Sequence, residues 1–143
     1  LSCNEWKLTN STKLSHKYNI KYAESSDGIN WNRNGIVAID FKYENEYAIS
    51  VPRVIKENDI YKMWYSYRGG LISNYYTIGY AESRDGKEWI RKDDSISFIG
   101  DDLSWDSQMK CYPFIFDYKN ERYMLYNGNE YGKTGVGLAV LKK

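Results

Sequence analysis

The sequence predicts an all-β fold assembled from repeated units. Residues 18–31 (YNIKYAESSDGINW) and 76–89 (YTIGYAESRDGKEW) are identical at nine of fourteen positions, with a constant offset of 58 residues. A repeat of this period indicates stacked copies of one supersecondary unit. The composition agrees, because fifteen tyrosines, five tryptophans and only two prolines among 143 residues suit the pleated surfaces of strands. The tryptophans that end the two copies, Trp31 and Trp89, are expected to pack between units.

The segments between the two copies form a second repeat, at an offset of 61 residues. Its matched positions are Pro52 with Pro113, Met63 with Met124, and Tyr65 with Tyr126. Residues 136–139 then overlay residues 78–81 as a shortened third copy of the first motif, and residues 2–6 resemble residues 127–131. The chain therefore contains one full unit flanked by parts of two more.

The full unit is predicted as four antiparallel strands, at roughly residues 50–56, 60–67, 76–83 and 88–92. The first two are rich in β-branched and aromatic residues and flank the polar loop 57–59. The Asp-Gly pair of the S-x-D-G-x-x-W segment predicts a hairpin between the last two, because glycine accepts the positive φ of such turns. No window carries apolar residues at i, i+3, i+4 and i+7 for long enough to predict a helix. A four-stranded unit that repeats near every 60 residues is typical of a propeller blade.

The predicted fold is thus a partial β-propeller with about two and a half four-stranded blades, forming a single domain over residues 1–143. Residues 1–35 would be an incomplete blade, 46–92 a full blade, and 110–143 a blade that lacks its last strand. A ring of four to eight blades needs more chain than this. We therefore expect a partner for the open edges, namely the missing N-terminal half of a longer propeller. The alternative is a second copy of the chain that completes one ring.

Charge and cysteine content exclude several other classes of protein. The net charge of +1, from 20 basic and 19 acidic residues spread along the chain, argues against nucleic acid or a membrane surface as partner. No apolar run approaches the roughly 20 residues that span a bilayer. Cys3 and Cys111 are expected as free thiols, which slightly favours the cytoplasm but leaves the compartment unknown. His16 is expected in an exposed loop, and neither a metal site nor a cofactor is expected.

Several motifs resemble the five-bladed propellers of the glycoside hydrolase clan that includes families 43, 32 and 68 and their uncharacterised relatives, with this chain as a C-terminal portion. They are residues 51–66 (VPRVIKENDIYKMWYS), 78–89, 105–107 (WDS), 112–114 (YPF) and 123–132 (YMLYNGNEYG). The resemblance covers nearly the whole chain. It implies a carbohydrate-active protein that binds or hydrolyses a glycan in a central funnel, although a fold does not by itself establish a function.

The resemblance also leaves open whether this chain is an enzyme. In that clan the funnel holds three acidic residues: a base near the N-terminus, a second aspartate, and a glutamate acid two residues before a strand proline. Here the matched acid positions are Ser50 and Cys111, and the base would lie upstream of Leu1. The alternative function is therefore a non-catalytic glycan-binding or assembly module, such as a half-propeller completed by a second chain.

Glu46 and Asp106 are the catalytic candidates, because each lies six or seven residues before a strand proline, where the chain would pass the funnel mouth. Inverting glycoside hydrolysis needs two carboxyl groups about 6.5–9.5 Å apart, with room for a water molecule. The alternative is that both are solvated loop charges or turn caps.

The substrate-binding candidates combine three kinds of side chain. Guanidinium groups can bond sugar hydroxyls or an anionic group, aromatic rings can stack on a sugar face, and asparagines at a glycine-containing rim can donate and accept hydrogen bonds. These candidates are Arg53, Arg68, Tyr112, Asn127, Asn129 and Tyr131, with Trp105 as a further aromatic residue. The alternative is structural: ion pairs for the arginines and core packing for the aromatic rings.

Overall fold

The computed structural model describes residues 2–9, 13–69, 73–98 and 104–141, and most of their regular structure is β-strand. The first sheet contains β1 (Ser2–Thr9), β2 (Lys13–Lys21), β3 (Val37–Ile39), β4 (Ala48–Glu57), β5 (Ile60–Gly69), β6 (Ser73–Ser83) and β7 (Ile90–Arg91). The second contains β8 (Cys111–Tyr118), β9 (Glu121–Asn127) and β10 (Val136–Val140). A 3-10 turn (Asp93–Ser95) follows β7, and the short α1 (Asn129–Gly132) follows β9.

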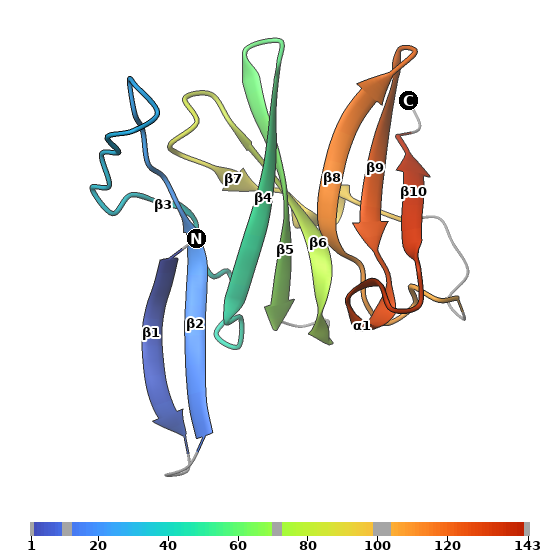
Figure 1. Ribbon diagram of the computed structural model, residues 1–143, viewed down its shortest axis with the longest axis horizontal. Helices are drawn as coiled ribbons and strands as arrows, with labels where there is room; N and C mark the ends of the chain where they lie inside the picture. Colours follow the sequence, from blue (N-terminus) through green and yellow to red (C-terminus); the bar gives the residue numbers. More distant parts are fainter. Residues whose placement is uncertain (1, 10–12, 70–72, 99–103, 142–143) are drawn as a thin grey trace.

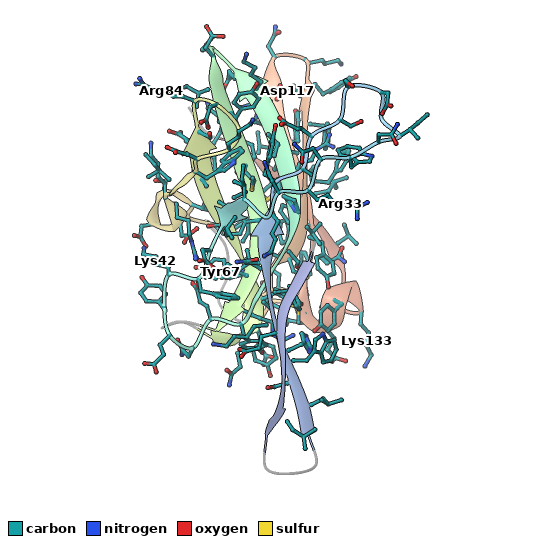
Figure 2. All side chains as sticks on the ribbon, turned by 90° about the vertical axis from the view of Figure 1, so that its left-hand side faces the viewer. Arg33, Lys42, Tyr67, Arg84, Asp117 and Lys133 are labelled. Carbon is teal, nitrogen blue, oxygen red and sulfur yellow. The ribbon has the colours of Figure 1, made fainter. Side chains whose placement is uncertain are left out.

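The strands stand side by side in three groups, and the β1–β2 hairpin projects beyond the rest of the molecule (Figure 1). Figure 2, turned by 90°, shows the same projection, with Lys133 nearer to the hairpin and Asp117 at the opposite end. Within the described residues, no helix is long and apolar enough to cross a bilayer.

The sheet order supports the repeated units. The first sheet runs β1-β2-β4-β5-β6-β7, with β3 paired to β2, and the second runs β10-β9-β8. Strands β4 to β7 are antiparallel neighbours in chain order, as predicted for the full unit. Strand β4 meets β2 through one parallel pair, Tyr18 with Ala48. The predicted all-β class is confirmed, and a partial propeller describes this arrangement.

The apolar core joins the two sheets. Trp64 of β5 and Ile78 of β6 form one buried cluster with Ile115 of β8 and Tyr126 of β9. Arg53 of β4 also reaches across, with its guanidinium carbon 4.4 Å from the ring centre of Phe114. Burial of these side chains provides most of the free energy that holds the units against one another.

Three local expectations differ from the structure. Strand β7 spans only two residues, because those before it belong to the Asp85-Gly86 turn. Strand β3 was not predicted, because three residues give too short a pattern, yet it buries Ile39 against β2. His16 lies in β2 and not in a loop, and its ring stacks on Tyr18 at 5.2 Å.

Each copy of the S-x-D-G-x-x-W repeat folds into the same capped turn. The carboxylates of Asp27 and Asp85 accept hydrogen bonds from the backbone N–H groups two and three residues ahead, at 2.7–2.9 Å. Gly28 and Gly86 adopt φ of 74° and 76°, which glycine allows without strain. The backbone hydrogen bonds hold the pKa of both aspartates below the usual range, so both caps are ionised at neutral pH.

The residues beside these turns differ in burial. Trp89 packs against the core cluster that contains Tyr65 and Ile39, whereas Trp31 is 50% exposed. The expectation that Trp31 packs between units is therefore wrong, since no core cluster of the described residues includes it.

Cys111 is a buried free thiol, and burial raises its pKa to about 11; the side chain of Cys3 lies outside the described residues.

Each strand proline lies within a β-bulge, directly after a residue with left-handed backbone. The pairing register shifts between Ser50 and Arg53 in β4, and at the matched place in β8. Val51 and Tyr112, which precede the prolines, have φ of 52° and 58°. A residue before proline normally prefers extended backbone, so both positions are strained. Bulges re-aim side chains and often lie beside functional sites.

We expect Val51→Gly to leave the free energy of unfolding unchanged or to raise it by up to about 1 kcal/mol, because glycine relieves the strain of a left-handed β-branched residue. Val54 is similarly exposed in the same strand but has no positive φ, so Val54→Gly should lower the free energy of unfolding by about 1 kcal/mol. Urea unfolding of both variants measures the difference. Equal losses at the two positions would show that Val51 is not strained.

Candidate functional site

Five tyrosines gather around Arg68 where the three groups of strands meet. Arg68 lies near the end of β5, and the rings come from β2, the residue before β4, β6, β8 and α1. We call this set the tyrosine–arginine cluster; its members are Arg68, Tyr18, Tyr47, Tyr76, Tyr112 and Tyr131. The full unit and both partial units of the chain therefore contribute side chains to this one cluster.

Arg68 is held by rings and hydroxyl groups. Its Nε donates to the Tyr47 hydroxyl at 2.6 Å, and its Nη1 donates to the Tyr131 hydroxyl at 3.2 Å. The guanidinium carbon lies 5.0 Å from the ring centre of Tyr47 and 4.9 Å from that of Tyr76, within range of cation–π attraction. A bulge in the β5–β6 pairing places Arg68, and Gly69 beside it has no room for a Cβ, which would lie 2.1 Å from the carbonyl oxygen of Asn45.

The tyrosine rings form a base and a rim. Tyr76 is only 4% exposed, and its hydroxyl bonds that of Tyr18. Tyr112 stacks on Tyr131 with ring centres 6.1 Å apart. The centres of both rings lie within 6.2 Å of the ring centre of Tyr76. Tyr131 is 49% exposed, so part of the stack is accessible to a ligand. Exposed aromatic rings beside polar groups are typical of small-molecule binding sites.

Strained backbone presents the two rim tyrosines. Tyr112 lies at the β8 bulge, where its backbone N–H donates to the Ser66 hydroxyl of the other sheet at 2.8 Å. Tyr131 follows Glu130 in a turn in which both residues are left-handed, with φ of 59° and 51°. Asn127 Nδ2 donates to the Tyr131 carbonyl at 3.1 Å and supports this turn. Strained non-glycine residues of this kind concentrate at functional sites.

The cluster supplies donors at neutral pH. Burial, with the hydrogen bond to Tyr76, raises the pKa of the Tyr18 phenol, and burial likewise raises the pKa of Tyr112. Their hydroxyl groups therefore stay protonated beside a charged guanidinium. Such a site can stack on a flat face and donate hydrogen bonds to oxygen atoms, and none of its members is a carboxylate that could act as an acid or base.

The structure brings four predicted binding residues together and leaves two elsewhere. Arg68, Tyr112 and Tyr131 belong to the cluster, and Asn127 supports it. Arg53 instead lies in the seam between β4 and β8, where its Nε donates to the Ile115 carbonyl at 3.4 Å.

Asn129 and Trp105 organise the loop that leads into β8. Asn129 Oδ1 accepts hydrogen bonds from the backbone N–H groups of Gln108 and Met109, at 2.9 and 2.8 Å. The Trp105 ring stacks on Tyr126 and covers Gly128, where a Cβ would lie 2.2 Å from the indole. Both residues therefore have a clear structural task.

Glu46 lies in a buried ion network. Its side chain is fully buried and accepts two hydrogen bonds from Arg91, at 2.7 and 2.9 Å. Arg91 also pairs with Asp93 at 2.8 Å and donates to the Asp40 carbonyl at 2.9 Å. The Lys42 backbone N–H occupies a further lone pair of Glu46 at 2.7 Å. These contacts leave Glu46 little capacity to activate a water molecule.

Asp106 has separate partners. The Tyr126 hydroxyl donates to Oδ2 at 2.6 Å, the Ser104 hydroxyl donates to Oδ1, and Lys110 Nζ lies 3.6 Å away. Burial raises the pKa of Asp106, but these three partners outweigh burial and hold it below the usual range. Asp106 is thus ionised at neutral pH, and it shares no partner with Glu46. The catalytic pair stays a prediction that this geometry does not favour.

A cavity of about 710 Å³ lies between β5–β6 and β9–β10. Its lining mixes charged and polar residues with apolar ones such as Trp64, Phe98, Met124 and Leu138. Its charged lining residues already have partners: Arg122 with Asp117 and Glu57, Lys62 with Glu57, and Lys110 with Asp106. The described residues contain no group of metal-ligating side chains. The tyrosine–arginine cluster is therefore the stronger candidate site.

Three tyrosines of the cluster, Tyr18, Tyr47 and Tyr76, are not among the site residues predicted from the sequence. A signal was present for two of them, because Tyr18 and Tyr76 are matched positions of the 58-residue repeat. Their hydroxyl groups meet in the structure, which shows that the repeat aligns positions of the candidate site as well as structural ones. Tyr47 had no such signal, since it lies between the repeated motifs.

Comparison with curated proteins finds two relatives in Mycobacterium tuberculosis, the uncharacterised proteins Rv1502 (strain H37Rv) and MT1551 (strain CDC 1551). Each is 42% identical over 125 residues, which is 86% of this chain and 40% of the relative. The chain therefore spans about 40% of the length of the curated relatives that it matches. No protein-family model matches the sequence.

Solved structures support the fold. A structure described as a glycoside hydrolase matches with a TM-score of 0.65 at 19% identity, covering 96% of this chain and 39% of the other. A structure described as a BT0996 RGII complex matches with a TM-score of 0.64 at 18% identity and the same coverage. At this identity the likeness establishes a glycoside-hydrolase-like fold and nothing about activity.

Glu46→Gln should lower the free energy of unfolding by about 1.5–3 kcal/mol, because it removes one of the two carboxylates that neutralise the buried Arg91 guanidinium and leaves Asp93 as its remaining charged partner. The control is Glu44→Gln, an exposed position in the same loop, which should change it by no more than about 0.5 kcal/mol. Urea unfolding measures both. A Glu46→Gln variant as stable as the wild type would mean that the ion network is not structural, and would restore Glu46 as a catalytic candidate.

Proposed function

We propose that this chain forms part of a propeller that binds a glycan at the tyrosine–arginine cluster. The observation that supports this most directly is the open stack of Tyr112 and Tyr131 beside the Arg68 guanidinium. A pyranose ring presents a flat C–H face to aromatic rings, while its hydroxyl groups accept hydrogen bonds from N–H and O–H donors. The glycoside-hydrolase-like fold of the neighbours agrees with a glycan as ligand.

Hydrolysis by this chain alone has less support than binding. The cluster lacks a carboxyl group, and both acidic candidates are engaged by their own partners. A hydrolase of the glycoside hydrolase clan that the sequence resembles needs a proton donor and a base in one funnel. If the whole propeller is an enzyme, its acidic residues come from blades outside this chain, and the cluster provides binding energy for the glycan.

A second candidate function is assembly, and the open strand edges favour it. Among the described strands, β10 pairs only with β9, and the side chains of Val136, Leu138 and Val140 are 46–64% exposed. Strand β1 likewise pairs only with β2 within the described chain. Open edges with apolar residues favour pairing with further strands. We propose that the remaining blades cover these edges, and that a second copy does so when the chain is alone.

Tyr131→Ala should weaken glycan binding by about tenfold or more, because it removes the exposed stacking ring. Tyr118→Ala is the matched control, since Tyr118 is also exposed but lies at the far end of β8, and it should bind as the wild type does. Isothermal titration against a panel of neutral and acidic oligosaccharides measures the affinities. Absence of binding to every sugar in the panel would refute the proposed function.

For assembly, sedimentation equilibrium should give the chain alone about twice its monomer mass of 16.8 kDa at micromolar concentration. Leu138→Lys should shift the mass towards the monomer, because it places a charge on the open β10 edge. Ile29→Lys, at an exposed position in the first Asp-Gly turn, should leave the mass unchanged. A wild-type chain that remains a monomer would contradict completion by a second copy.

A further inference from the structure

Arg68 differs from the partly buried Arg91 and Arg122 in what neutralises its charge. Arg91 pairs with Glu46 and Asp93, and Arg122 pairs with Asp117 and Glu57. Among the side chains that the structure describes, Arg68 has no carboxylate partner, and its nearest neighbours are phenols. A guanidinium drawn partly out of water without a counter-charge favours an anionic ligand.

Two donors of the cluster have no acceptor among the described residues. Nε and one N–H of Nη1 are taken by Tyr47 and Tyr131, whereas no described group accepts a hydrogen bond from Nη2. The Tyr112 hydroxyl also has no hydrogen bond to a described residue, and its ring lies against the half-exposed Tyr131. The two terminal nitrogens of a guanidinium form a planar fork that fits the two oxygens of a carboxylate.

We infer that the glycan bound at the tyrosine–arginine cluster is acidic, with a hexuronate carboxylate paired to Arg68 and the uronate ring stacked against Tyr131. This rests on the proposed glycan-binding function and specifies its ligand class. A uronate joins a carboxylate and a flat-faced ring in one residue, which matches a guanidinium fork beside an exposed aromatic ring. A neutral sugar would leave the Arg68 charge uncompensated, so the site discriminates against it.

A carboxylate fits this site better than other sugar-borne anions. Sulfate and phosphate groups stand out from the ring on an ester oxygen and present three terminal oxygens, which favour several cationic donors. Here one guanidinium supplies the only positive charge among the six members of the cluster. The carboxyl carbon of a hexuronate is bonded directly to the ring, so the charge and the stacked face remain close together.

The test compares trisaccharides of galacturonate, glucuronate and mannuronate with their methyl esters and with the neutral hexose trisaccharides, by isothermal titration with the 143-residue chain. At least one acid should bind about tenfold or more tightly than its own ester, because a hydrogen bond to a charged group is stronger than one to a neutral group. Added salt should weaken binding of the acid and leave binding of the ester unchanged. Sulfated and phosphorylated galactose are included to distinguish the source of the anion.

Variants assign the preference to one residue. Arg68→Gln should abolish the preference for the acid over its ester, and Arg68→Lys should keep only part of it, because an ammonium is a point charge without a fork. Arg84→Gln is the control. Arg84 is exposed, and Figure 2 places it far from Lys133, which directly follows α1 and therefore marks the position of the cluster. This variant should keep the full preference for the acid. Thermal unfolding shows whether each variant is folded, and the acid–ester comparison on the wild type holds without any variant.

The outcomes separate the two proposals. Binding of neutral and acidic sugars with equal affinity would overturn the acidic ligand and leave glycan binding intact. Preference for the sulfated or phosphorylated sugar would overturn the carboxylate. Failure to bind any sugar would overturn both, and an acid preference that persists in a folded Arg68→Gln variant would show that another residue holds the anion.

Discussion

The buried guanidinium of Arg91 is the interaction on which the rest of the structure depends. It joins Glu46, ahead of β4, to Asp93, after β7, and to the Asp40 carbonyl after β3. The charged side chains of this network are at most 10% exposed, so loss of Arg91 would leave the fully buried Glu46 carboxylate without its ion-pair partner. The network thereby ties together the segments that follow β3, precede β4 and follow β7.

This network also positions the candidate site. Tyr47 follows Glu46 directly, and Gly69 packs so closely on the backbone of Asn45 and Glu46 that no Cβ fits between them. Arg68, which precedes Gly69, bonds Tyr47 through Nε. The Glu46 ion pair thus fixes the segment from which Tyr47 extends and against which Gly69, beside Arg68, is packed.

The cluster concentrates backbone strain and unpaired donors in one place. Tyr112 and Tyr131 are both left-handed non-glycine residues, each held by a hydrogen bond from or to a neighbouring element. Strain of this kind persists only where surrounding structure compensates for it. A propeller gives such compensation, because bulges in adjacent inner strands can turn side chains towards a shared space without breaking the sheets. The fold explains why the site is possible, and the side chains determine what it binds.

The sequence by itself determined the repeated units, the strand pairs of the full unit and the two capped Asp-Gly turns. The strand pairs and turns follow from local pattern, because alternation and turn residues act between neighbours in the chain. The repeated units follow from the constant offset between matching motifs. It also indicated Arg68, Tyr112 and Tyr131, through residue type and nearby glycines. Only the tertiary structure decided that these three meet Tyr47 and Tyr76, while Glu46 and Asp106 enter separate networks. Those outcomes depend on contacts such as Arg68 with Tyr131 and Glu46 with Arg91, which join residues far apart in the chain, and one sequence read alone contains no measure of such distances.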